Sequence, residues 1–283
     1  MQALAERTDI LAERKIIHRT QGHQQGPITR LVSPGDLGEL IKPFVFLDSF
    51  NMEASRSSGF GYHPHSGIVT VTTIFEGNTE YEDSTGKAGV LTAGTVEWMQ
   101  AGNGVWHTGK AVDHKQGHIR GYQLWLALPS ALENSEPESI YVESAKIPKV
   151  GVVRVIIGEY QGVSSPLPQI SPITYLHVRL ENGESWTFDP PADHDVLWIA
   201  IDEGSIRVSG ETISNEIAIF DSQSLPLTIQ AQGVVNFMLG SAMRHPYPLI
   251  TGYYSVHTTD DALRIGEEGI KTVGKRLKAE GRI

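Results

Sequence analysis

Short runs of β-branched and aromatic residues, separated by turn residues, constrain what this chain can fold into more than any other feature. The clearest run is IVTVTTIFEG at residues 68–77, and FVFLDSF at residues 44–50 precedes it. Segments with the composition of turns, PGDLG, STGK and TAG, lie at residues 34–38, 84–87 and 92–94. Many short strands with regular turns are typical of β-sandwiches and β-barrels. We therefore expect an all-β protein.

A polar segment divides the chain into two β-rich halves. Residues 127–150 are rich in Pro, Ser and Glu, and a new β-type run, VVRVIIGEY, begins at residue 152. A chain of 283 residues is long enough for two domains that each bury a core. We predict one domain over residues 18–147 and a second over residues 148–283, and their similar lengths indicate an internal duplication.

Two segments at the ends of the chain have helical patterns. Residues 3–17 carry leucine and isoleucine at helical spacing with charges between them, which predicts a helical extension over residues 1–17. Such a helix would either cover a barrel or form a dimer arm. The tail, residues 258–283, starts with Thr259 or Asp260 as a helix cap and ends with basic residues, so we expect it to be partly helical.

The net charge and the absence of cysteine exclude several functions. The formal net charge of −10 would repel a nucleic-acid backbone, so we expect no direct nucleic-acid binding, although a protein partner remains open. With no cysteine, the chain has no disulfide, thiolate nucleophile, iron–sulfur cluster or Cys-type zinc site. Any bound metal must be held by histidine and oxygen ligands.

The sequence gives no sign of a membrane segment. Its first residues, MQALAERTDILAERK, mix charges and lack an apolar stretch, so we expect neither a signal peptide nor an anchor. The longest apolar run, VLWIAI at residues 196–201, is far shorter than the roughly 18 residues that span a bilayer. We expect a cytoplasmic protein. Motifs of hydrolases, P-loop NTPases and dinucleotide-binding domains are also absent.

Three histidines have a spacing that suits a metal site. His63 and His65 flank a proline, and in an extended segment residues i and i+2 point to the same face. His107 follows in GNGVWHTGK, where glycines allow a sharp turn before the next strand. Three neutral imidazoles suit iron, copper, nickel or zinc. The alternative is that these histidines are ordinary polar residues at a strand end.

Several separate segments resemble one known family. FGYHPHSGIVTVTTIFEG at residues 60–77, DSTGKAGVLTAGTVEWMQAGNGVWHTG at residues 83–109 and GYQLWLALP at residues 121–129 are similar to signature segments of the pirin family. This family belongs to the cupin superfamily and includes quercetin dioxygenase-like bacterial proteins. The resemblance covers most of residues 28–150. It implies two jelly-roll (cupin) β-barrels packed face to face, with short peripheral helices.

The resemblance also implies where a metal binds. It places one metal, usually iron, in the N-terminal barrel, with His63, His65 and His107 as ligands, and none in a degenerate C-terminal barrel. The family's fourth ligand, a glutamate two residues after the last histidine, is replaced here by Gly109. A second cupin carboxylate position falls on Val69. The implied site is therefore a three-histidine site with more open positions, or one that has lost its metal.

Two further residues could support this site. Glu97 stands where the family more often has glutamine, and it could act as a substitute ligand or as an outer-shell partner. Gln123 follows the family pattern and is an outer-shell candidate.

Other polar and aromatic residues near these motifs have a plainer interpretation. Trp98, Met99, Trp106 and Trp125 could line a substrate pocket, but barrel core is the favoured role.

The remaining histidines lack metal-site spacing. His194 has no partner histidine, and His245 lies in a proline-fixed turn. The loop carrying His114, Lys115 and His118 either closes over the site or is solvated.

Two functions from different classes follow. The first is a non-haem, metal-dependent dioxygenase of the quercetin 2,3-dioxygenase type, acting on a flavonol-like aromatic. The alternative is a non-catalytic binding or transcription-coregulatory protein with a weakened or absent metal. Because three neutral histidines cannot neutralise a divalent ion, we expect partial metal occupancy that is lost as the pH falls towards about 6.5.

Overall fold

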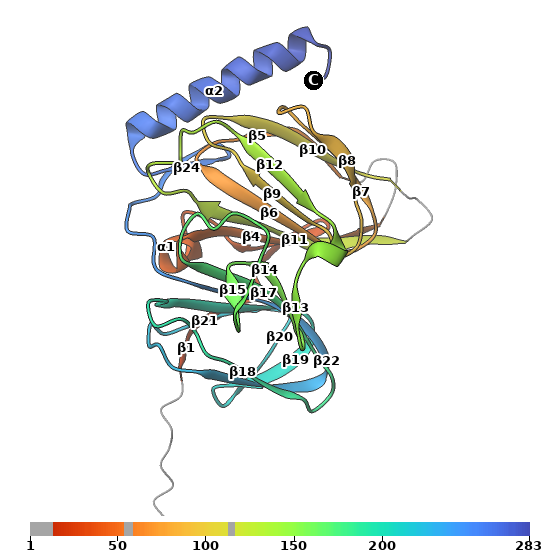
Figure 1. Ribbon diagram of the computed structural model, residues 1–283, viewed down its shortest axis with the longest axis vertical. Helices are drawn as coiled ribbons and strands as arrows, with labels where there is room; N and C mark the ends of the chain where they lie inside the picture. The colour runs from red at the N-terminus through yellow and green to blue at the C-terminus, as the bar shows by residue number, and fades with distance from the viewer. Residues whose placement is uncertain (1–13, 54–58, 113–116) are drawn as a thin grey trace, which may run out of the picture.

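The computed structural model describes residues 14–53, 59–112 and 117–283 and is 54% strand and 11% helix. This composition confirms the all-β prediction. The two β domains are stacked along the long axis of the molecule, and one long helix lies across the outer end of the N-terminal domain (Figure 1). Within the described residues, no helix combines the length and the apolar character needed to cross a bilayer.

The N-terminal domain consists of two sheets that face each other. The larger sheet has the strand order β12-β9-β6-β11-β4-β3-β2, and the smaller one has the order β5-β10-β7-β8. Strand β6 carries the β-branched run predicted from sequence, and seven of its nine residues are buried because both of its faces are covered. The strands are β2 (His23–Gln25), β3 (Ile28–Val32), β4 (Phe44–Glu53), β5 (Gly59–His65), β6 (Ile68–Glu76), β7 (Thr79–Asp83), β8 (Ala88–Leu91), β9 (Val96–Gln100), β10 (Val105–Ala111), β11 (His118–Ala127) and β12 (Glu138–Val142).

The C-terminal domain is built around one strongly bent sheet with the main strand order β1-β21-β19-β22-β17-β14-β13, to which β18 and β20 add. Two small hairpins, β15–β16 and β23–β24, complete the chain. The strands are β1 (Ile16–Thr20), β13 (Lys149–Val150), β14 (Val153–Ile157), β15 (Glu159–Tyr160), β16 (Val163–Ser164), β17 (Ile173–Leu180), β18 (Ser185–Phe188), β19 (Val196–Val208), β20 (Glu211–Ser214), β21 (Ile217–Phe220), β22 (Leu227–Ala242), β23 (Ile250–Gly252) and β24 (Ser255–His257). The helices are α1 (Leu37–Ile41), the 3-10 turn η1 (Ser144–Lys146) and α2 (Asp260–Ala279).

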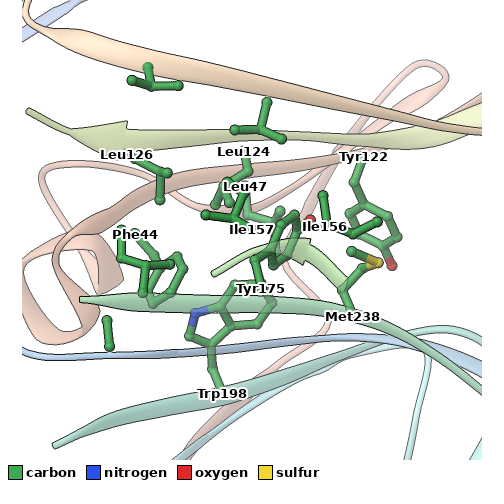
Figure 2. Close-up of a cluster of buried hydrophobic side chains, with 14 of the residues drawn as sticks. Phe44, Leu47, Tyr122, Leu124, Leu126, Ile156, Ile157, Tyr175, Trp198 and Met238 are labelled. Atoms are coloured by element: carbon green, nitrogen blue, oxygen red, sulfur yellow. The ribbon is translucent and has the colours of Figure 1, made fainter. Parts of the chain in front are cut away.

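One hydrophobic core joins the two domains. Phe44, Leu47 and Leu124 from the N-terminal domain belong to the same buried cluster as Tyr175 and Trp198 from the C-terminal domain (Figure 2). The rings of Phe44 and Trp198 meet edge to face, with centroids 5.3 Å apart. Because this cluster is shared, the two domains bury apolar surface against each other.

The start of the described chain corrects one prediction. The helix expected over residues 3–17 lies mostly outside the described residues, but Ile16 and Ile17 belong to strand β1. This strand pairs with β21 of the C-terminal sheet, and Arg19 forms an ion pair with Glu216 there. Pairing with an open sheet edge satisfies the backbone of residues 16–20, which outweighs a local helical pattern. Residues 18–20, assigned to the N-terminal domain from sequence, therefore lie in the other sheet.

The end of the chain, in turn, packs against the N-terminal domain. Helix α2 is capped by Thr259, whose hydroxyl accepts a hydrogen bond from the Ala262 amide at 3.1 Å. It then packs on the outer side of β10, where Trp106 Nε1 donates to the Ile270 carbonyl at 2.9 Å. The two ends of the described chain are thus each attached to the domain formed by the other half of the sequence.

Candidate metal centre

Strands β5 and β10 bring the three predicted histidines together. The two strands pair antiparallel, and His63 lies directly opposite His107. His65, two residues further along β5, points to the same face, as expected for an extended chain. Among the described residues, these three form a group in which one ring nitrogen of each lies within 4.8 Å of the others.

Hydrogen bonds from two of these rings fix which nitrogen carries the proton. His63 Nδ1 lies 2.8 Å from the Gly61 carbonyl oxygen, and His65 Nδ1 lies 3.2 Å from the Tyr254 carbonyl oxygen. A carbonyl oxygen can only accept a hydrogen bond, so both Nδ1 atoms must carry the ring proton. The Nε2 atom of each neutral ring is therefore left with a free lone pair.

The distances around His107 fit a cation. His107 Nε2 lies 3.2 Å from His65 Nε2, while the Glu97 carboxylate lies 3.7 Å from His107 Nδ1 and favours the ring proton on that side. Two Nε2 lone pairs then face each other with no proton to share. Two neighbouring imidazole nitrogens bound at about 2.0–2.1 Å to one tetrahedral or octahedral ion are about 2.8–3.4 Å apart. The residues present therefore fit a metal ion.

Burial keeps the imidazoles in the form that binds metal. Burial, together with the nearby His107, lowers the pKa of His63 to about 4 and that of His65 well below its ordinary value. Both rings are consequently neutral at pH 7. Protons compete with a metal for these nitrogens at a lower pH than the value near 6.5 expected from free imidazole.

Glu97 is placed behind His107 rather than beside the facing Nε2 atoms. Its carboxylate accepts a hydrogen bond from the Thr72 hydroxyl at 2.7 Å and is almost completely buried. Burial alone would raise the pKa of Glu97, but His107 and Thr72 bring the pKa below its ordinary value. Within the described chain, the group of converging ligand atoms does not include this carboxylate. Its position suits an outer-shell partner that orients and polarises an imidazole ligand.

Two hollows meet at the histidines. A small inner cavity of about 50 Å³ is lined by His63, His107, Glu97, Gly109 and Gln123, with apolar side chains behind them. An open groove of about 750 Å³ lies on the other side. Its lining includes His63, His65, Gln123, Trp125 and Tyr254. His63 and Gln123 line both, so the histidine cluster separates an enclosed space from one open to solvent.

Comparison with known proteins identifies the family. The Pirin family model matches residues 27–126. A pirin-like protein of Caulobacter vibrioides is 30% identical over 213 residues, which cover 72% of this chain and 76% of that protein. The chain belongs to the pirin family.

Solved structures support the same assignment. A crystal structure of quercetin 2,3-dioxygenase from Acinetobacter baumannii superimposes with a TM-score of 0.84 at 26% identity, covering 94% of this chain and 98% of that one. The bacterial pirin YhhW from Escherichia coli, solved in complex with nickel(II), has a TM-score of 0.66 at 19% identity and covers 83% of this chain and 99% of its own. The second likeness shows the shared fold.

In this pirin, Gly109 and Val69, the two positions where the resemblance led us to look for a carboxylate ligand, differ in their surroundings. Gly109 follows an irregularity in the β5–β10 pairing and lines the inner cavity. A Cβ atom there would meet only the Thr79 Cγ2 atom at 3.3 Å and the Glu80 carbonyl oxygen at 3.9 Å. Val69 instead lies in the core shared by the two domains. A side chain at position 69 would therefore lie in that core, and position 69 lines neither the inner cavity nor the groove.

The aromatic residues singled out from the sequence fall into different places. Trp98 and Met99 are buried in hydrophobic clusters and Trp106 contacts α2, so none of these three lines the groove or the cavity. Trp125 does line the groove. Its ring stacks on Phe46 with centroids 3.9 Å apart and meets the ring of His65 at 4.9 Å.

Within the described residues, none of the other histidines named from the sequence joins the cluster. His114 and Lys115 are outside the described residues, and His118 is exposed with its Nδ1 3.1 Å from Asn51 Oδ1. His194 is buried in the C-terminal domain, with Nδ1 2.9 Å from the Ser241 hydroxyl. His245 is buried without a second histidine ligand nearby among the described residues.

Sequence reasoning missed Tyr254. Its carbonyl oxygen contacts His65 from 189 positions further along the chain. No local pattern in the sequence shows where the segment that carries Tyr254 docks.

Proposed function

We propose that this pirin binds a divalent first-row metal, iron in particular, through His63, His65 and His107, and acts as a dioxygenase on a flavonol-like aromatic. The observation that carries the proposal is the convergence of three neutral imidazoles whose ring nitrogens lie within 4.8 Å of one another. The imidazole donor set suits redox-active iron, copper and nickel as well as zinc. The similarity to the quercetin 2,3-dioxygenase of Acinetobacter baumannii supports the choice of reaction.

The chain supplies a groove of the right size for an aromatic substrate. A groove of about 750 Å³ falls within the range of about 300–1,000 Å³ typical of small-molecule sites. The stacked rings of Phe46 and Trp125 are part of its lining, and the Arg30 guanidinium lies 3.9 Å from the Phe46 ring centroid, so the groove offers an aromatic substrate both apolar and charged contacts. The Gln123 side chain, which also lines the groove, can hydrogen-bond an oxygen of the substrate.

The inner cavity suits a much smaller molecule. Its volume of about 50 Å³ exceeds the roughly 30 Å³ that one water molecule occupies in the liquid, and its lining is mostly apolar. It can hold a small molecule such as O2 beside His63 and His107, while the groove holds the aromatic. A bound metal would supply the electron transfer between O2 and substrate, and the residues around it would orient the substrate and exclude water.

The test is oxygen uptake by metal-stripped protein before and after loading with iron. We expect the iron-loaded protein to consume O2 when quercetin is added and the stripped protein not to do so. His107→Ala, loaded in the same way, serves as the control because it removes one of the three imidazoles. Iron-loaded protein that binds iron but takes up no O2 would contradict the dioxygenase proposal and leave a non-catalytic binding role.

A further inference from the structure

The segment at residues 250–257 reaches across from the C-terminal half and lies against the metal-binding strand. Ser255 forms an isolated parallel bridge with Ser66, the residue after His65, and the Val256 amide donates to the Ser66 carbonyl at 3.3 Å. This placement brings the Tyr254 carbonyl oxygen within 3.2 Å of His65 Nδ1. Within the described residues, the carbonyl that fixes the tautomer of His65 therefore belongs to a segment of the other half of the chain.

A chain of buried side chains holds this segment in place. The hydroxyls of Ser66 and Ser255 are 2.8 Å apart, and the Ser66 hydroxyl lies 2.9 Å from His257 Nε2. His257 Nδ1 lies 3.5 Å from the Glu133 carboxylate, which accepts hydrogen bonds from the Thr258 amide at 2.6 Å and hydroxyl at 2.7 Å. All of these residues are at most 5% exposed. We call Ser66, Ser255, His257 and Glu133 the buried polar network.

The packing around the network leaves little freedom. A Cβ atom on Gly67 would lie 2.1 Å from the Val256 carbonyl oxygen, and one on Gly266 would lie 2.5 Å from both His257 Nε2 and the Ser66 hydroxyl. Tyr254 itself has a φ of 68°, a left-handed conformation that is costly for a residue with a side chain. Such a conformation persists only where its surroundings hold it, and here the network does so from the next residue.

The order of these side chains, serine–histidine–glutamate, also occurs in hydrolases, but a hydrolytic role does not fit. Ser66 is completely buried and lines neither the groove nor the inner cavity. A nucleophile must reach its substrate. The network is therefore a structural connection to His65.

We propose that the buried polar network positions the Tyr254 carbonyl so that it fixes the tautomer and orientation of His65, and thereby strengthens metal binding. This inference rests on the proposed function only in taking the three histidines as metal ligands. The network residues act on the metal through Tyr254 and His65, so they are positioning residues, and because Ser255 also lines the groove, the test measures metal binding without substrate. Removing such an outer-shell partner weakens metal affinity about 10–100-fold in other sites.

The test compares two variants that each remove one buried serine hydroxyl. Ser255→Ala breaks the network. Ser241→Ala is the control: it removes an equally buried hydroxyl in the C-terminal domain, which lies 2.9 Å from His194 Nδ1. Affinity for Co2+ is measured by competition with a chelator, the visible Co2+ spectrum reports ligand geometry, and the melting temperature of metal-free protein reports stability. Glu133→Gln, which keeps the side-chain size, is measured as a second network variant in case Ser255→Ala does not fold.

We expect both serine variants to lower the melting temperature, but only Ser255→Ala to weaken Co2+ binding by about 10-fold or more and to shift the Co2+ spectrum. Glu133→Gln should change affinity in the same direction. If the network variants bind Co2+ as tightly as the wild type and with the same spectrum, the inference is wrong while the metal site stands. If the wild type itself does not bind Co2+, the metal site and the proposed function fail together with it.

Discussion

At the scale of single residues, the site depends on which atom of each histidine faces which partner. His107 presents Nδ1 to Glu97 and Nε2 to His65, so a carboxylate lies on one side of its ring and a lone pair on the other. The sequence predicted the three histidines because an i, i+2 pair on a strand needs only local geometry. It left Glu97 open between ligand and outer-shell partner. Whether the Glu97 side chain on β9 reaches His107 on β10 depends on how the two sheets pack against each other.

The first prediction concerns Gly109→Glu. The position lines the inner cavity beside His107, and the added side chain meets one methyl group at 3.3 Å, which a small shift can relieve. A carboxylate there would neutralise part of the charge of a divalent ion held by neutral histidines. We expect purified Gly109→Glu to retain more metal than the wild type, measured by elemental analysis after dialysis against a chelator. Wild-type protein that already holds stoichiometric iron, unchanged in the variant, would show that the missing carboxylate does not weaken the site.

The second prediction concerns Glu97→Gln. The variant keeps the size of the side chain but removes the charge that polarises His107 through Nδ1. We expect metal affinity to fall by about 10-fold, in line with other outer-shell partners. Glu138→Gln is the matched control, because Glu138 is exposed on β12 and outside the site. Equal affinities in the two variants would mean that Glu97 serves only the stability of the barrel.

At the scale of secondary-structure elements, the sequence predicts what local patterns determine. Strands such as β4 and β6 are visible as β-branched and aromatic runs, and the cap of α2 at Thr259 was one of two predicted residues. The pairing of β1 with β21 and the docking of α2 on β10 were not predictable. Both depend on contacts between segments far apart in the sequence, which residue patterns do not encode.

The third prediction tests how α2 is held against the metal-binding strand. A Cβ atom on Gly269 would lie 1.8 Å from the backbone carbonyl oxygen of Asn103, just before β10. In a free helix, replacing glycine by alanine stabilises by about 1 kcal/mol. We expect Gly269→Ala instead to lower the melting temperature, because the helix must move away from the barrel. Gly35→Ala, where nothing lies within 4 Å of the new atom, should leave the melting temperature nearly unchanged. A stabilised Gly269→Ala would indicate that α2 does not pack as described.

At the scale of the whole molecule, three histidines, two buried and one partly buried, lie where the N-terminal domain meets the C-terminal half. The ring of His177 on β17 stacks on Phe75 of β6 with centroids 4.6 Å apart, and the His245 amide donates to the Lys42 carbonyl at 3.2 Å. His257 contacts Ser66 as described above. Burial is the largest cause that lowers the pKa of each to about 4, with positive charge from Arg154 adding at His177 and from Lys42 at His245.

The fourth prediction follows from the sign of these shifts. An unfolded histidine has a pKa near 6.5, so between about pH 6.5 and pH 4 the unfolded chain binds more protons than the folded one. The free energy of unfolding should therefore be largest above pH 6.5 and fall as the pH is lowered through this window. Each full proton taken up on unfolding changes it by about 1.4 kcal/mol per pH unit. Urea unfolding of metal-free protein at several pH values between 7.5 and 4.5 measures this slope, to which His63 and His65 contribute in the same sense.

One variant isolates the contribution of the domain interface to this slope. His177→Phe keeps a ring against Phe75 but cannot take up a proton, so we expect its stability to depend less steeply on pH, by up to one proton, with little loss of stability near pH 5. His23→Gln is the control, since His23 is exposed on β2. If His177→Phe and the wild type have parallel curves while the control matches both, protonation of His177 does not govern acid stability. A shallower slope in His177→Phe alone would instead show that the two cupin domains are held together by a contact that acid disrupts, because a charged imidazole cannot remain buried between them without a partner.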